Sequence, residues 1–182
     1  MAPPHPTERT LRRVLWAAAA ILVLAVAAYL TKGVNTTARP KVLTNGATTS
    51  RVKGFQQIGF TVRAADGATA RYCGLLALTT AQQDQGLMYR TNLAGYDGML
   101  FQFIDPTTIE FYMKDTVIPL SIAWFDAGGH YVSATNMAPC QTAVCPLFGA
   151  AAPYTVAIEV LEGGLGHLGI GPGSTLTVGG AC

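Results

Sequence analysis

The longest apolar run in the chain predicts a segment of membrane length. Residues 14–30 contain 17 positions without a charge, and Arg9, Arg12 and Arg13 precede them. Seventeen apolar residues lie at the short limit for a helix that crosses about 30 Å of hydrocarbon. Because basic residues that flank a span stay on the cytoplasmic side, we predict a cytoplasmic segment 1–13, a single-pass anchor over 14–30 and an exported remainder.

Two other interpretations of this run stay open. The small residues of Ala25-Val26-Ala27 are typical of a processing site, so the run could belong to a cleaved signal peptide, and the protein would then be secreted. The second alternative is a buried core helix. The lack of an amphipathic stripe and the arginines in front of the run weigh against it.

A change in composition separates this run from the rest of the chain. Residues 31–53 are rich in threonine, asparagine, glycine and alanine, with hardly any apolar periodicity, and they predict a flexible linker. The basic residues in this linker could contact anionic lipid, but a solvated linker is the favoured explanation. A globular extracytoplasmic domain is expected over residues 54–182.

Short apolar runs separated by turns predict that this domain consists mainly of strands. Within residues 79–85 a threonine followed by glutamine three positions later indicates a capping box, and a short helix should end at Gly86. The glycine-rich residues 162–171 are weakly helical at best. Strands are expected at 58–64 and 68–78, joined by a turn at Asp66-Gly67, and at 99–104, 121–125, 130–135, 154–161 and 174–178.

Composition supports one domain rather than two. Of 182 residues, 50% are hydrophobic and 12% are charged, and the net charge is +2, which predicts no nucleic-acid partner. Twenty glycines and ten prolines without a period favour turns and short strands. The predicted fold class is α+β and β-rich. It is a small barrel-like antiparallel or mixed sheet with one or two short helices, preceded by one N-terminal transmembrane helix.

The stretch 111–120 places Lys114 and Asp115 side by side inside an apolar run. If it is a strand, the side chains alternate, so Asp115 shares a face with Met113 and Lys114 shares the other with Tyr112. Burying an unpaired charge costs several kcal/mol. These two charges therefore need partners, the mouth of a pocket or a strand end.

The four cysteines all follow the apolar segment, and in an exported domain they predict disulfide bonds. Cys140 and Cys145 are close enough in sequence to pair locally, which leaves Cys73 for Cys182. Three connectivities are formally possible. No C-x-x-C spacing and no neighbouring histidine is present, so neither a metal site nor a redox motif is predicted.

Motifs for catalysis are missing from the predicted domain. His130 lies in a turn and His167 in a glycine-rich stretch, and no G-x-S-x-G elbow, P-loop, dinucleotide fingerprint or calcium loop is present. No cofactor is predicted. Carboxylate catalysis stays open, with Asp115 and either Glu159 or Asp97 as the pair.

Several strings of residues carry a family resemblance. They are Gly86 to Arg90, Gly98 to Phe101, Phe111 to Leu120, and Pro139 to Pro146 with its two cysteines. Together they resemble the uncharacterised prokaryotic family named domain of unknown function 192, over about residues 60–178. The resemblance implies a small exported or membrane-tethered domain with a β-barrel-like α+β fold, and no agreed activity. The last helix of the family pattern is replaced here by glycine-rich residues.

Polar residues embedded in apolar strings remain as candidates for a site: Arg90, Lys114, Asp115 and Glu159, with Tyr112 beside them. One interpretation is an internal ion-pair network in which the two basic groups neutralise the two acids. The other is a pocket in which Arg90 and Lys114 hold an anionic or carbonyl-bearing ligand.

Two functions follow from these observations. The first is a non-catalytic module that is tethered to the membrane and recognises an envelope polymer, a peptide or another exported protein. The alternative is an envelope hydrolase or transferase that uses Asp115 and Glu159.

Overall fold

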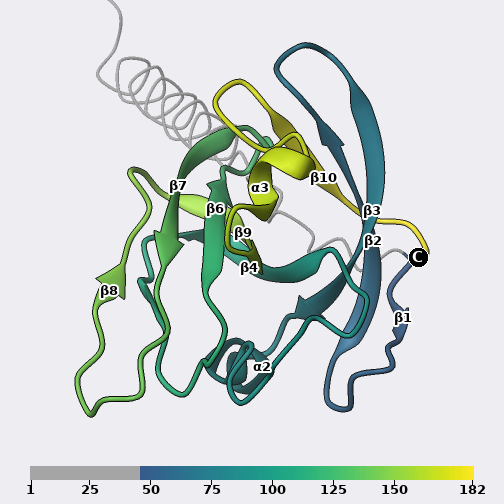
Figure 1. Ribbon diagram of the computed structural model, residues 1–182. Helices are drawn as coiled ribbons and strands as arrows, with labels where there is room; N and C mark the ends of the chain where they lie inside the picture. The colour runs from purple at the N-terminus through teal and green to yellow at the C-terminus, as the bar shows by residue number, and fades with distance from the viewer. Residues whose placement is uncertain (1–45) are drawn as a thin grey trace, which may run out of the picture. The chain divides into compact units, whose positions relative to one another are not determined.

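The computed structural model describes residues 46–182, which form a domain made mainly of strands (Figure 1). This confirms the predicted β-rich α+β class. The two helices are α2 (Thr80–Gln85) and α3 (Gly164–His167). The strands are β1 (Thr48–Thr49), β2 (Gln56–Arg63), β3 (Thr69–Ala77), β4 (Gly98–Thr107), β5 (Phe111–Tyr112), β6 (Leu120–Phe125), β7 (Tyr131–Met137), β8 (Leu147–Phe148), β9 (Tyr154–Leu161) and β10 (Thr175–Val178).

One sheet of eight strands organises the domain. Its order is β1-β2-β3-β4-β9-β6-β7, and β10 also pairs with β2. All of its neighbours are antiparallel except β3 and β4, which are parallel. A parallel pair needs a crossover connection, and here the chain between β3 and β4 carries α2, which lies at the opposite end of the domain from α3 (Figure 1). Strands β5 and β8 form a separate pair.

The ladder of the main sheet is open, and a short contact links its two ends. The Tyr131 amide donates to the Ser174 carbonyl at 3.1 Å, and the Leu176 amide donates to the Gly129 carbonyl at 2.8 Å. A Cβ on residue 129 would lie 2.4 Å from the Leu176 carbonyl oxygen, so this approach requires glycine. The sheet is therefore curled, and the barrel-like closure is limited to this contact between β10 and the turn before β7.

The two faces of the sheet bury two different cores. Central strand β9 shows the alternation, because Ile158 and Val160 belong to one core, whereas Ala157 belongs to the other. We call the first the aliphatic core; it contains Ile58, Phe60, Val62, Leu76, Leu100, Phe125, Val156, Ile158, Val160, Leu176 and Val178, among others. We call the second the aromatic core; it contains Phe55, Tyr96, Met99, Phe101, Met113, Ile122, Trp124, Met137, Tyr154 and Ala157, among others.

The packed part of the chain begins before the predicted boundary at residue 54. Strand β1 pairs with β2, and Val52 is buried in the aromatic core. The Tyr96 hydroxyl accepts a hydrogen bond from the Arg51 amide at 3.1 Å and donates one to Gln57 Oε1 at 2.6 Å. The end of the segment predicted as a linker is therefore part of the domain.

Predictions for the N-terminal segments concern residues outside the described part. The segment 1–13, the apolar run 14–30 and most of the linker fall before residue 46. Within residues 46–182, neither helix has the length and apolar character that a bilayer crossing demands.

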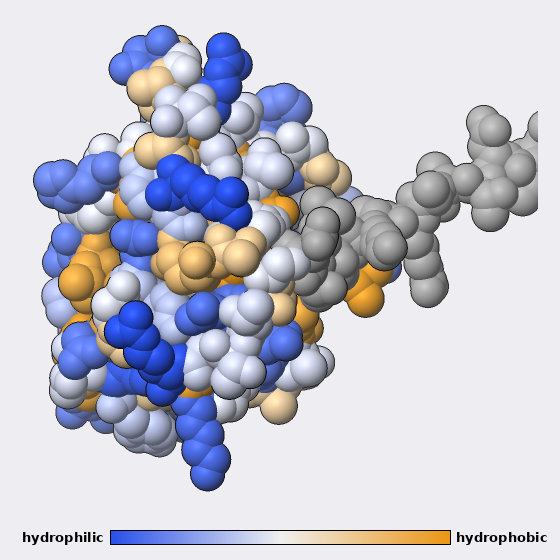
Figure 2. All heavy atoms as spheres, turned by 90° about the vertical axis from the view of Figure 1, so that its right-hand side faces the viewer, coloured by the Kyte–Doolittle hydropathy of each residue, from blue (hydrophilic) through white to orange (hydrophobic). Residues whose placement is uncertain are grey.

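Both favoured disulfides are confirmed. Cys73 on β3 is bonded to Cys182, which ties the segment after β10 to the sheet, and Cys140 is bonded to Cys145. The side of the domain that carries β1 to β3 is mainly hydrophilic, with small, scattered apolar patches (Figure 2). Residues 65–71, around the hairpin turn between β2 and β3, are exposed.

Candidate functional site

A cavity of about 210 Å³ opens on the aromatic side of the sheet. It lies between α2, the segment that leads into β5, and the strands β4 and β9. One ordered water needs only about 10–15 Å³ of such space. The cavity is therefore large enough for a chemical group of several heavy atoms.

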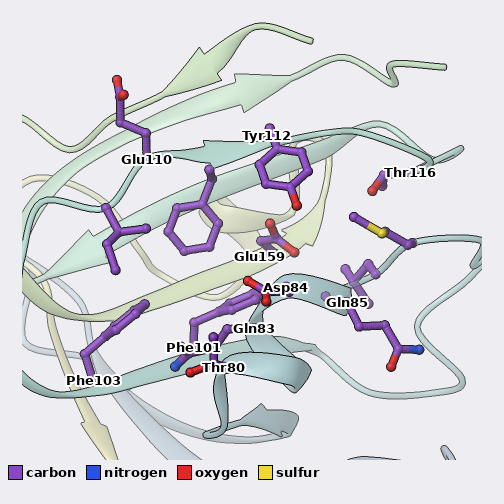
Figure 3. Close-up of a pocket in the computed structure, with 15 residues that line it drawn as sticks. Thr80, Gln83, Asp84, Gln85, Phe101, Phe103, Glu110, Tyr112, Thr116 and Glu159 are labelled. Atoms are coloured by element: carbon purple, nitrogen blue, oxygen red, sulfur yellow. The ribbon is translucent and has the colours of Figure 1, made fainter. Parts of the chain in front are cut away.

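Glu159 lines this cavity from the middle of the sheet (Figure 3). On β9 it is paired with Met99 of β4 and Ile122 of β6, and its residue is only 5% exposed. Within residues 46–182 no hydrogen bond or ion pair involves its carboxyl group. Burial raises the pKa of Glu159 from 4.5 to about 8, because the charged form is poorly solvated there. The group is therefore mainly protonated at neutral pH and can donate a hydrogen bond.

Aromatic side chains form much of the cavity wall. Phe101 and Phe103 come from β4, and Phe111 and Tyr112 come from β5. The rings of Phe101 and Phe111 meet edge to face with centroids 5.0 Å apart, which is a favourable arrangement. Tyr112 is 40% exposed at the mouth. These contacts hold the wall in place before any ligand arrives.

Helix α2 is held by its own sequence and supplies the polar side of the cavity. The predicted capping box is present: Thr79 Oγ1 accepts from the Gln82 amide at 3.3 Å, and Gln82 Oε1 accepts from the Thr79 amide at 3.1 Å. Gln83 Nε2 donates to the Gln102 carbonyl of β4 at 3.0 Å. With α2 fixed in this way, the Asp84 carboxylate points into the cavity (Figure 3).

The structure divides the predicted site residues into two groups. Tyr112 and Glu159 line the cavity, whereas Arg90, Lys114 and Asp115 do not. Arg90 lies over the Phe55 ring at 5.8 Å instead. The ion-pair network is not formed, because the one ion pair within residues 46–182 joins His130 to Asp126 in a turn.

The expectation of a strand across residues 111–120 is wrong. Regular pairing ends at Tyr112, and Asp115 takes a left-handed backbone conformation with φ of 56°. Its amide donates to the Cys140 carbonyl at 3.0 Å, and its carboxylate accepts from the Tyr89 hydroxyl at 2.8 Å. This hydrogen bond raises the pKa of Tyr89. Asp115 therefore lies in a turn and not at the end of a strand, and the Tyr89 hydroxyl is the hydrogen-bond partner of its carboxylate.

Sequence reasoning missed two acidic residues of the cavity. Asp84 lies on α2, and Glu110 lies just before β5. Asp84 has polar neighbours in sequence, so the search for embedded charges passed over it, whereas Glu110 lies between Ile109 and Phe111, one residue before the stretch that was searched. The capping box correctly located α2 in the sequence. The position of Asp84 within that helix was the signal that could have pointed to Asp84 as a site residue.

Fold and site together define a β-rich α+β domain with a preformed, acidic and aromatic cavity. The chain belongs to the family DUF192, described as "Uncharacterized ACR", whose family model matches residues 61–178. The family expected from the sequence strings is thus confirmed, and it brings no assigned reaction.

Two solved structures are similar to this chain. A protein of unknown function from Novosphingobium aromaticivorans DSM 12444 is 31% identical with a TM-score of 0.64, over 72% of this chain and 92% of that one. A protein from Sinorhizobium meliloti 1021, provisionally described as a transcription regulator, is 27% identical with a TM-score of 0.61, over 68% of this chain and 95% of that one. No curated protein matches the chain.

Proposed function

We propose that this protein is a non-catalytic binding module of the cell envelope, held at the outer face of the membrane by residues 14–30. Its ligand group enters the cavity above Glu159. The ligand is part of an envelope polymer, a peptide or another exported protein. The apolar run behind three arginines supports the anchor, and the two disulfides are typical of an oxidising compartment.

The observation that carries this proposal is the carboxyl group of Glu159. Buried polar groups nearly always have a hydrogen-bond partner, either a protein group or an ordered water, and no protein group among the described residues bonds to this carboxyl. It faces an open cavity instead. A ligand that fills the cavity would provide the missing partner, so the arrangement favours binding.

The separation of the two predicted carboxylates favours binding over catalysis. The alternative function, a hydrolase or transferase, was to use Asp115 together with Glu159. Only Glu159 lines the cavity, and Asp115 is hydrogen-bonded to Tyr89 at the surface. The two groups therefore do not face one bound substrate.

The test is a binding screen on the full chain in detergent, followed by isothermal titration. The panel contains envelope glycans, short peptides, amines and carboxylates. At least one neutral or cationic compound should bind saturably and be recovered unchanged. Tyr112→Ala should weaken its binding about tenfold by removing an aromatic wall. Tyr89→Ala, at a residue 73% exposed and outside the cavity, is the matched control.

Two results would contradict the proposal. One is that no compound binds; the other is that Tyr112→Ala and Tyr89→Ala bind equally well.

The anchor is tested separately, by alkaline extraction of membranes from cells that express the full chain. Release of the intact chain into the soluble fraction would exclude a retained anchor.

A further inference from the structure

The side chains that line the cavity include three carboxyl groups and no basic group. Asp84 comes from α2, Glu110 from the segment before β5, and Glu159 from β9. None of the lining residues is lysine, arginine or histidine. Since a cleft lined by one sign of charge attracts the opposite sign, this cavity repels anions and favours a positive group. Arg90 and Lys114, which were expected to hold an anionic ligand, do not line this cavity.

The aromatic wall suits an organic cation. The faces of phenylalanine and tyrosine rings attract positive charge within about 6 Å, and Phe101, Phe111 and Tyr112 line the cavity. The same rings offer apolar surface to a hydrocarbon stem. An inorganic metal ion does not fit, because residues 46–182 contain no group of three or more metal-ligating side chains close enough to hold one.

We propose that this cavity binds an ammonium group on an alkyl stem, with the stem along Phe101 and Phe111 and the ammonium donating to Glu159. The inference deepens the proposed binding function and rests on it. Glu159 supplies an independent reason beyond the acidic cluster: it is buried, has no partner in the described domain and points into the cavity (Figure 3). An ammonium carries three donors and would satisfy it.

Binding of such a cation is coupled to a proton. A positive ligand favours the ionised form of Glu159, so the proton leaves as the ammonium enters at pH values below 8. The other titratable groups that face Glu159 across the cavity are Asp84 from α2 and Tyr112 from β5, whereas the Glu110 carboxylate points away from the cavity (Figure 3). Strand β4 contributes only Phe101 and Phe103 to the lining. Affinity should therefore rise between pH 6 and pH 8, with release of a proton.

The experiment is isothermal titration of the full chain in detergent with matched small ligands. Nα-acetyl-lysine methylamide and n-butylammonium carry the positive group. Nα-acetyl-norleucine methylamide keeps the stem without it. The lysine compound should bind at least about tenfold more tightly than the norleucine compound, and more tightly at pH 8 than at pH 6. If n-butylammonium binds as well as the lysine compound, a free amine is sufficient; if it binds more weakly, the lysine side chain of a peptide is the better ligand.

Variants place the effect in the cavity. Glu159→Gln should remove the pH dependence and the proton release, and Asp84→Asn should weaken binding of the cation but not of the neutral analogue. Asp105→Asn, at an exposed residue that does not line this cavity, is the matched control and should behave like the parent chain. Unchanged cation binding in both Glu159→Gln and Asp84→Asn would overturn the inference.

The remaining outcomes separate this inference from the proposed function. If neutral glycans or the norleucine compound bind as tightly as the cations, and Tyr112→Ala weakens them, the ammonium inference is overturned while the binding module stands. If no compound of any charge binds, both are overturned.

Discussion

Ile158 and Glu159 are consecutive residues of β9, and both are buried, but they face two different interiors. Ile158 is 0% exposed and packs in the aliphatic core. Glu159 is 5% exposed and faces a cavity. Burying a carboxyl group without a partner destabilises a fold. One face of the strand thus contributes stability, and the other gives up stability for a site.

The segments that pack on the two faces of the sheet explain why one face is fully packed and the other contains a cavity. On the aliphatic side, β10 pairs with β2, and Leu168 and Ile170 fill the space beside α3. On the aromatic side the cover consists of the six-residue helix α2, the two-residue strands β5 and β8, and irregular chain. These short and irregular segments do not fill the space above the sheet completely, and the cavity remains between them.

The largest effect is expected from placing a polar group on the aliphatic face. Ile158→Gln should lower the free energy of unfolding by about 4–5 kcal/mol, because it removes a core side chain and buries an amide without partners. Urea denaturation followed by the fluorescence of buried Trp124 measures this. Glu159→Gln is the matched change one residue away and should raise the free energy of unfolding at pH 7, because glutamine avoids the cost of keeping a buried carboxyl group protonated. Equal losses in both variants would show that the two faces do not differ.

The next effect is a pH dependence that belongs to the cavity side. Burial raises the pKa of Glu159 from 4.5 to about 8. Between these values the unfolded chain binds fewer protons than the folded one, so stability falls as pH rises, and it stays constant above pH 8. Since one pKa unit corresponds to about 1.4 kcal/mol, the full loss is on the order of 5 kcal/mol, of which about 4 kcal/mol falls between pH 4.5 and pH 8.

Urea midpoints at pH 4.5, 6 and 8 measure this loss. Glu159→Gln should remove most of the slope, since glutamine does not titrate. Exposed Glu162→Gln should leave it in place. A parent chain that is as stable at pH 8 as at pH 4.5 would contradict the burial argument.

The sequence predicted the main secondary-structure elements and the disulfides better than it predicted the residues that meet in the cavity. Alternation in 154–161 identified β9, and Glu159 stood out as the interruption of one face. The capping box located α2, and the spacing of Cys140 and Cys145 identified a disulfide. These signals are local: each depends on residues a few positions apart, and local chemistry determines them.

The parts that were missed depend on contacts between distant segments. The strand expected at 111–120 became a turn because the backbone of 113–116 bonds to Cys140, some 25 residues away in sequence. Asp84 and Glu159 share a cavity only because the parallel pairing of β3 with β4 carries α2 across the sheet. The pattern of hydrophobic residues does not show which distant segments pair, so the set of residues that line the cavity could not be derived from it.

A moderate difference is expected between the two disulfides. Cys73 and Cys182 are 109 residues apart, and Cys140 and Cys145 are five apart. In the chain-entropy model a longer loop gives more stabilisation. Replacing the first pair by serine should cost about 4–5 kcal/mol, and replacing the second about 2 kcal/mol. The second pair lies in the cover of the aromatic face, so its removal alone should weaken ligand binding. If removing the Cys73–Cys182 bond weakened ligand binding and removing the Cys140–Cys145 bond did not, the ligand site would lie outside this cavity.

The smallest effect tests whether Asp115 belongs to the surface or to the site. Asp115→Ala removes the acceptor of the Tyr89 hydroxyl and places alanine in a left-handed conformation, which costs about 1 kcal/mol. The melting temperature should fall slightly. Asp115→Gly loses the same hydrogen bond but tolerates this backbone conformation, so it should lose less, and neither variant should change ligand affinity. A normal melting temperature with lost ligand binding in Asp115→Ala would instead make Asp115 part of the site, and Glu159 would then no longer be the distinguishing carboxylate of this domain.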